Sequence, residues 1–156
     1  MSSSAPHDAM ARRLAEHPFF RGQSPGLLQD VAGATQDRAY RAGEFLLREG
    51  QGADTFLALE DGKVALELFA TDRRITVQTL GHGEVLGWSW LTPPHRWTLD
   101  AIAVKPTHAL AVDAAALRER FTQHPKDGYE FLLRLVPVLA GRLHAMQLQL
   151  FEANVL

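Results

Sequence analysis

The pattern of hydrophobic and polar positions changes twice along the chain, near residues 37 and 113. Between these points, short runs rich in Val, Ile, Leu, Phe and Thr are separated by Gly and Asp. The runs span residues 38–40, 44–48, 55–60, 63–69, 74–80, 98–104 and 108–112. Gly43 and Gly62 stand between runs, where a turn with positive φ suits a residue without Cβ. Short strands at this spacing predict an antiparallel barrel or sandwich over about residues 37–112.

Helices are expected on both sides of this region. Residues 1–8 are interpreted as a disordered lead-in, and a short helix is predicted over 8–15. A second helix is predicted over 25–34, with Ser24 as its N-cap and Pro25 at its first position. After Asp113, the expected cap of a further helix, the pattern stays helical to the end of the chain, with a break at His124-Pro125. We therefore expect one domain over residues 9–156, with the strands at 37–112 and C-terminal helices at 113–156.

The last predicted helix, from about residue 128, carries an apolar seam. Its members repeat at spacings of three and four: Leu132, Val136, Leu139, Leu143, Met146 and Leu150. Such a repeat predicts a coiled-coil-like interface between two copies of the chain. The alternative is an amphipathic helix that packs on its own barrel. Pro137 inside the seam is expected to kink the helix or remove one hydrogen bond.

Residues 40–66 add a family resemblance to this picture. The matching positions are Gly43-Glu44, Leu46, Glu49-Gly50, Ala53-Asp54, Phe56, Leu59 and Gly62-Lys63-Val64. They resemble the front half of a cyclic nucleotide-binding domain, the sensor β-roll of Crp/Fnr-type regulators. The resemblance implies a mainly β fold, an antiparallel jelly-roll or double-stranded β-helix with flanking helices. It also implies that the long C-terminal helix is a dimerisation helix and that residues 83–103, here called the cassette, hold the ligand.

The cassette departs from the family pattern at two positions. Aligned on Gly87, Trp88 falls where the family has a Glu that binds the ribose hydroxyl, and Trp97 falls where it has an Arg that binds the phosphate. Removing one partner of a desolvated charge pair typically costs about 2–5 kcal/mol, so tight cyclic nucleotide binding is not expected. A register slip that places Arg96 on the family Arg would restore the charge. Strand alternation opposes this slip, because Trp97, Leu99 and Ala101 share one face.

Three functions remain open for this pocket. Its expected residues are Gly87, Trp88, Ser89, Trp90, Leu91, Arg96, Trp97 and Thr98. The first function is a regulatory sensor that binds a non-standard small ligand, or none, and signals through its C-terminal helix. The second is a scaffold whose pocket is plugged by Trp88 and Trp97. The third is a cyclic nucleotide receptor that uses Arg96.

Composition narrows the function classes further. The 156 residues carry a formal net charge of −2, and no Lys/Arg run suggests a surface that binds nucleic acid. No segment after Leu150 suggests a helix-turn-helix, so direct DNA binding is not expected and the output partner is an unidentified protein. The absence of cysteine, of a leader and of a long apolar segment fits a cytoplasmic protein that does not enter a membrane.

Catalytic and metal-binding patterns are not found in the sequence. The seven histidines are scattered, and no nucleophile, P-loop or HExxH motif is present. Asp100 is interpreted as an outward-facing polar residue of the strand that follows Trp97. We therefore expect neither an enzyme nor a bound metal or cofactor.

Overall fold

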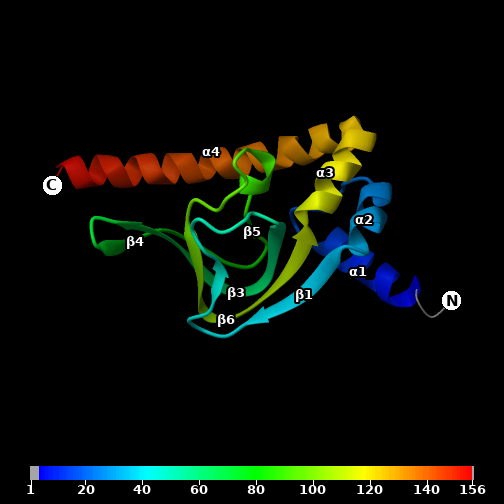
Figure 1. Cartoon of the computed structure of the whole chain (residues 1–156), viewed down its shortest axis with the longest axis horizontal. Helices are drawn as coiled ribbons and strands as arrows, with labels where there is room; N and C mark the ends of the chain where they lie inside the picture. The colour runs from blue at the N-terminus through cyan, green and yellow to red at the C-terminus, as the bar shows by residue number, and fades with distance from the viewer. Residues whose placement is uncertain (1–3, 156) are drawn as a thin grey trace.

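The structure is a computed structural model and describes residues 4–155. It begins with α1 (Ser4–Glu16) and α2 (Pro25–Ala32), which pack together at one end of the β-roll (Figure 1). The Oγ of Ser24 accepts a hydrogen bond from the Leu27 N–H at 3.4 Å, which confirms the predicted cap. The disordered lead-in was wrong for residues 4–8, which are helical, and residues 1–3 lie outside the described part of the chain.

The strands form one antiparallel sheet that folds on itself as a roll. The order along its main path is β1 (Thr35–Tyr40), β6 (Asp100–Asp113), β3 (Thr55–Ala70) and β4 (Arg73–Leu80). Two short strands lie off this path, β2 (Phe45–Leu47) against β6 and β5 (Val85–Leu86) against β3. The expected jelly-roll architecture with flanking helices is confirmed.

Local breaks in the sequence pattern did not always end a strand. The predicted runs 55–60 and 63–69 are one strand, β3, with irregular pairing to β6 around Gly62. Gly62 has a φ of +107°, and a Cβ there would lie 2.5 Å from the Cα of Thr107. The glycine therefore bends a continuous strand where β6 comes close, instead of ending it.

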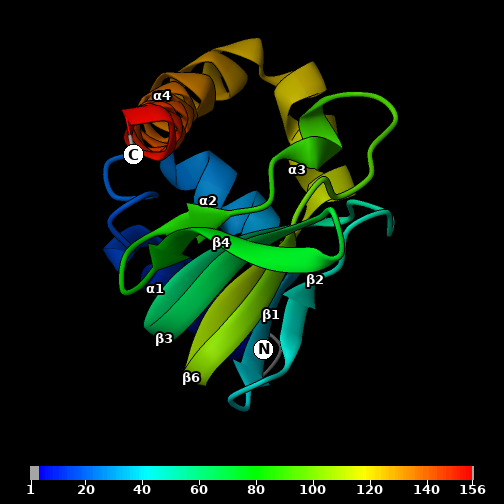
Figure 2. The same cartoon turned by 90° about the vertical axis from the view of Figure 1, so that its left-hand side faces the viewer.

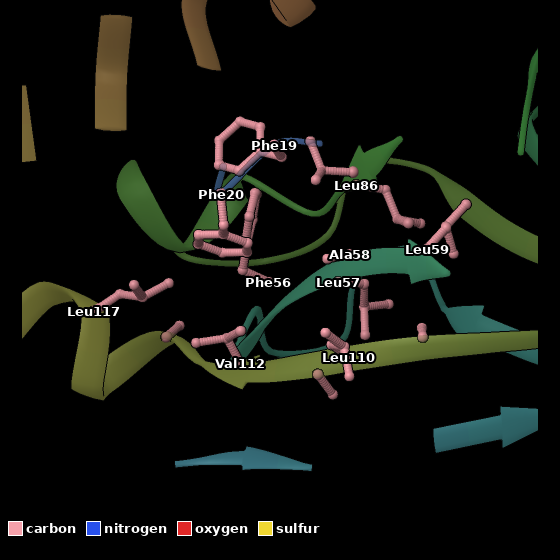
Figure 3. Close-up of a cluster of buried hydrophobic side chains, with 14 of the residues drawn as sticks. Phe19, Phe20, Phe56, Leu57, Ala58, Leu59, Leu86, Leu110, Val112 and Leu117 are labelled. Atoms are coloured by element: carbon pink, nitrogen blue, oxygen red, sulfur yellow. The ribbon is translucent and has the colours of Figure 1, made fainter. Parts of the chain in front are cut away.

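The core lies between the roll and the helices at its end. Phe19 and Phe20 come from the α1–α2 connection and face Phe56 on β3 (Figure 3). The ring of Phe131 lies 5.2 Å, centroid to centroid, from both Phe19 and Phe56. Because Phe131 belongs to the last helix, this aromatic cluster attaches that helix to the roll.

Two helices complete the chain, α3 (Ala114–Gln123) and α4 (Pro125–Val155). The Asp113 carboxylate accepts a hydrogen bond from the Ala115 N–H at 2.9 Å, as expected for the N-cap of α3. α4 runs along one side of the roll and projects beyond it on the same side as the β4 hairpin (Figures 1 and 2). It continues through Pro137 without a break in the helix.

α4 presents two different faces. One face packs in cis and contains the buried residues Phe131, Leu135 and Arg142. Leu132, Val136, Leu143 and Leu150 of the predicted seam are instead 42–65% exposed. Leu139 and Met146 are half-buried against the core. Four members of the seam therefore lie off the cis-packing face, whereas Leu139 and Met146 are shared with it. The helix can pack on its own roll and still offer an apolar surface.

α4 differs from the sequence analysis in one respect, since no apolar segment long enough to span a membrane was expected. Within residues 4–155 it is the one helix that is long and apolar enough, by length and composition, to cross a membrane. Its Arg134 and Arg142 donate hydrogen bonds to the carbonyls of Phe19 and Val85. These contacts place one side of the helix against the folded domain. The length and apolar composition of α4 are therefore weak evidence for a membrane span.

Candidate functional site

The cassette connects β4 to β6 and turns beside Gly87. β5 ends at Leu86, Gly87 has a φ of +90°, and Trp88 is the N-cap of a single 3₁₀ turn, η1 (Ser89–Leu91). The return segment then turns at Pro93-Pro94, pairs with Gly52 through the isolated bridge of Arg96, and bends at Thr98 and Leu99 before β6 begins at Asp100. The helical part of the cassette is thus a single turn, and β6 begins three residues after Trp97.

Trp97 lies inside the roll, as strand alternation predicts. It is 6% exposed. Its backbone N–H donates to the Gln51 carbonyl at 2.9 Å, and its backbone carbonyl accepts from the Gly50 N–H at 2.8 Å. A Cβ on Gly87 would lie 2.9 Å from the indole Cη2. The absence of a side chain at Gly87 therefore makes room for the indole of Trp97.

Trp90 and Leu91 were wrongly assigned to the pocket. Trp90 is fully buried, its Nε1–H donates to the Gly87 carbonyl at 2.6 Å, and its ring lies 6.0 Å from Phe56 and 5.9 Å from Phe131. Leu91 is half-buried against the same core. The 3₁₀ turn rotates these two side chains away from the cavity, so Trp90, and not Trp88 or Trp97, is the indole that packs against Phe56.

Arg96 also lies outside the pocket. Its side chain is exposed, and its Nη1 donates to the Gly50 carbonyl at 2.8 Å. Its backbone pairs with Gly52 in an isolated antiparallel bridge. The neighbouring Trp97 faces inward, so alternation turns Arg96 outward. The register in which Arg96 would bind a phosphate is therefore wrong.

Gly87, Trp88, Ser89, Trp97 and Thr98 line one cavity. Its other lining residues are Leu47, Leu66, Leu86, Leu99, Asp100, Ala101 and Arg142. The cavity volume is about 30 Å³, whereas pockets for drug-sized ligands measure about 300–1,000 Å³. The cavity has room for about two water molecules. A nucleotide would need the tryptophan side chains to move.

Arg142 is the lining residue that the sequence analysis missed. It is 4% exposed, and its guanidinium carbon lies 4.9 Å from the centroid of the Trp88 ring. Its Nη2 donates to the Val85 carbonyl, and its Nη1 has no hydrogen-bond partner among residues 4–155. Burial lowers the pKa of Arg142 to about 10, so the guanidinium remains positively charged at neutral pH.

The sequence holds one signal for Arg142. It follows Val138 by four residues and Leu135 by seven, which places all three on one face of α4. Once Leu135 is known to pack in cis, Arg142 is expected against the roll as well. This second face was not predicted, because most apolar residues of the helix had already been assigned to the seam.

The acidic residue of the cavity is already paired. Asp100 is 8% exposed and not outward-facing as expected. Its carboxylate accepts from the Glu49 N–H at 2.8 Å and from Nη1 of Arg74 at 2.7 Å. These partners compensate its charge, so Arg142 is the cavity's uncompensated charge among the described residues.

A metal centre finds no support in residues 4–155, where no group of three or more His, Cys, Asp or Glu side chains could hold an ion. The cavity is lined mainly by apolar groups, with Ser89, Thr98, Asp100 and Arg142 as its polar side chains. This arrangement suits binding of a small molecule, since it offers a mainly apolar recess with a few polar groups.

The antiparallel roll, the cassette between β4 and β6, and the long helix that reaches the cassette together define a β-roll domain with a docked C-terminal helix. Solved structures have the same fold. A protein from Geobacter metallireducens, classed as a cyclic nucleotide-binding protein, matches with a TM-score of 0.75 and 26% identity over 86% of this chain and 98% of that one. A cyclic nucleotide-binding domain from Methylobacillus flagellatus matches with a TM-score of 0.79 and 20% identity, covering 95% of this chain and 86% of that one.

The catabolite activator protein of Thermus thermophilus is also similar, with a TM-score of 0.67 and 25% identity over 88% of this chain and 63% of that one. The family model for the cyclic nucleotide-binding domain matches residues 37–124, more than half of the chain. The chain therefore belongs to the cyclic nucleotide-binding domain family and has the Crp/Fnr-type fold.

Proposed function

We propose that this chain is a regulatory sensor domain that binds a small molecule in the cassette cavity and signals through α4. The observation that carries the proposal is the position of Arg142, which belongs to α4 yet lines the cavity beside Trp88 and Gly87. One side chain thus belongs both to the ligand site and to the helix that would carry the output. An occupant that alters the contact between Arg142 and Trp88 would bias the position of α4.

The output surface in this proposal is a homodimer through the exposed seam of α4. Leu132, Val136, Leu143 and Leu150 repeat at helical spacing on a face that this chain does not cover. Tyr129, Leu133 and Phe151 extend the exposed apolar surface. A second copy that packs in parallel along this face would bury these side chains about a two-fold axis.

Val136→Glu tests the dimer, and Val104→Glu is its matched control. Both valines are about equally exposed, 55% and 50%, but Val104 lies on β6, away from the seam. We expect light scattering to give a dimer for the wild type and for Val104→Glu, and a folded monomer for Val136→Glu, because two like charges would meet at the interface. A wild type that is monomeric at tens of micromolar would refute the seam.

Trp88→Ala tests the connection between cavity and helix. Because the chain has no cysteine, Gln147→Cys on α4 gives one spin-label site per copy. Removing the indole that Arg142 stacks on should change the label-to-label distance distribution across the dimer. Phe45→Ala is the control, because it removes a ring that Arg48 covers at 4.0 Å on the roll. If the Trp88→Ala distribution matches the wild type, the cavity does not act on α4.

That last result would favour a second function, a scaffold with a filled pocket. The supporting observation is the small cavity, about 30 Å³, into which the buried indole of Trp97 already projects. Trp88 is only half-buried, so it is the weaker of the two plugs. Under either function we infer a cytoplasmic, non-catalytic regulatory role with a further protein as the output partner, because the chain belongs to the cyclic nucleotide-binding domain family.

A further inference from the structure

Arg120 of α3 and Arg142 of α4 differ in how their charges are compensated. Arg120 donates to the Asp30 and Asp127 carboxylates, each at 2.8 Å. Arg142 has no carboxylate within 4 Å among residues 4–155, although it is 4% exposed. A buried charge without a counter-ion is strongly disfavoured. The two ion pairs of Arg120 are typical of a structural role. Arg142 has no carboxylate partner, as is expected of a side chain that binds an anion.

The hydrogen bonding of the Arg142 guanidinium indicates which type of anion it could bind. Nη2 is engaged by the Val85 carbonyl, while Nη1 is buried without a partner and belongs to a residue that lines the cavity. A guanidinium presents its N–H donors in a planar fork that matches the two oxygens of a carboxylate or of another oxyanion. The hydroxyls of Ser89 and Thr98 line the same cavity.

The cavity volume limits the size of that anion. About 30 Å³ holds two or three water-sized groups. Trp97 cannot move readily, because backbone hydrogen bonds to Gly50 and Gln51 hold it and Gly87 lies against its ring. Trp88 is half-buried, so it is the wall that a larger occupant would displace. The space therefore holds two or three heavy atoms as it stands, and an ion of three or four heavy atoms once the half-buried Trp88 shifts.

We propose that the cassette cavity binds a compact oxyanion, a small carboxylate or inorganic ion of three or four heavy atoms, through the guanidinium of Arg142. The inference rests on the proposed sensor function and names its ligand class. Such an ion would lie between Arg142 and the indole walls and would stabilise the folded chain by supplying the missing counter-charge. Glu84 and Asp100 are the nearest acidic influences: Glu84 raises the pKa of Arg142, and Asp100 is held by Arg74.

The probes for the test are sodium formate, sodium nitrate and sodium phosphate. Each is titrated at constant ionic strength against sodium gluconate, an anion too bulky for the cavity. Nitrogen-15 spectra resolve the three indole N–H groups, which single substitutions assign. We expect saturable shifts of Trp88 and Trp97 with formate or nitrate, and a smaller shift of Trp90, whose ring lies in the core and whose Nε1–H contacts the cavity lining only through the Gly87 carbonyl. Phosphate reports whether a tetrahedral ion also fits.

The variants are Arg142→Met, Arg142→Lys and the control Arg134→Met. Arg134 is also on α4 and donates to a backbone carbonyl, that of Phe19, at 2.8 Å, but it does not line the cavity. Arg134→Met should bind as the wild type does, Arg142→Met at least tenfold more weakly, and Arg142→Lys between the two. If Arg142→Met does not fold, Arg142→Lys, which keeps the charge, decides the test.

The outcomes separate this inference from the proposed function. Equal shifts with gluconate, no saturation, or unchanged affinity in folded Arg142 variants would overturn the anion site. If anions fail but Trp88→Ala changes the label distances on α4, the sensor survives with another ligand class. If anions bind as expected but the label-to-label distances on α4 do not change in Trp88→Ala, the anion site is supported and the signalling function is refuted.

Discussion

Adding a methyl group at Gly87 tests how closely the cassette packs on Trp97. In Gly87→Ala the new Cβ would lie 2.9 Å from Cη2 and 3.1 Å from Cζ3 of Trp97, and 3.2 Å from the Thr55 carbonyl oxygen. Gly43→Ala is a close control. Its φ of +93° matches the +90° of Gly87, but nothing lies within 4 Å of its Cβ position.

The two substitutions differ in one contribution. A non-glycine residue in the positive-φ region costs about 1–2 kcal/mol, and both alanines incur this cost. Overpacking in a filled core costs about 1–3 kcal/mol more, and only Gly87→Ala incurs it. The free energy of unfolding should therefore fall by about 2–5 kcal/mol in Gly87→Ala and by about 1–2 kcal/mol in Gly43→Ala.

Urea denaturation followed by circular dichroism measures both values, provided that the m-values match the wild type. The origin of the difference is tested in a Trp97→Leu background, where the smaller side chain removes the close contact. There Gly87→Ala should cost about as much as Gly43→Ala, which corresponds to a coupling of about 1–3 kcal/mol with Trp97. Equal costs for the two alanines in the wild-type background would refute the idea that Gly87 exists to accommodate Trp97.

Three further predictions concern the same site and the core. Trp97→Ala should lower the free energy of unfolding by about 3–5 kcal/mol, and Trp88→Ala by clearly less, in the same assay. His17 donates from Nε2 to the Leu59 carbonyl and accepts from the Phe19 N–H at Nδ1, and burial lowers its pKa. The neutral ring thus stabilises the fold above pH about 6.5, and the contribution is lost as pH falls through the lowered folded pKa; His17→Gln should flatten this dependence in urea titrations. Cyclic AMP and cyclic GMP should bind no tighter than about 100 μM by calorimetry, because the cassette lacks the family Arg and Glu.

Elements marked by local signals were predictable from the sequence. Ser24 and Asp113 cap helices because short polar side chains satisfy free N–H groups at a helix start, and this depends on neighbours only two or three residues away. Alternation placed Trp97 inward for a similarly local reason. Contacts between residues far apart in the sequence explain what the local pattern did not predict. β3 stays continuous past Gly62 because β6 pairs with it both before and after this residue.

The site itself was less predictable, since its side chains come from separate elements. A single 3₁₀ turn decides that Trp90 enters the core while Trp88 faces the cavity, and no periodicity exists over three residues. Arg142 lies about 57 residues from Val85, and only the docking of α4 against the roll brings the two together. Asp100 was misplaced because its ion-pair partner, Arg74, comes from another strand.

The position of the positive charge changes what ligand binding can do in this domain. By the family resemblance, the phosphate-binding Arg would stand at the position of Trp97, on the roll itself. Here the charge facing the cavity comes from α4. A ligand held only by the roll would act on the helix indirectly, whereas one held by Arg142 would contact the helix at the moment of binding. Its affinity would then differ between two helix positions whenever one of them withdraws the guanidinium. A hundredfold difference in affinity would shift the equilibrium between those positions by about 2.7 kcal/mol.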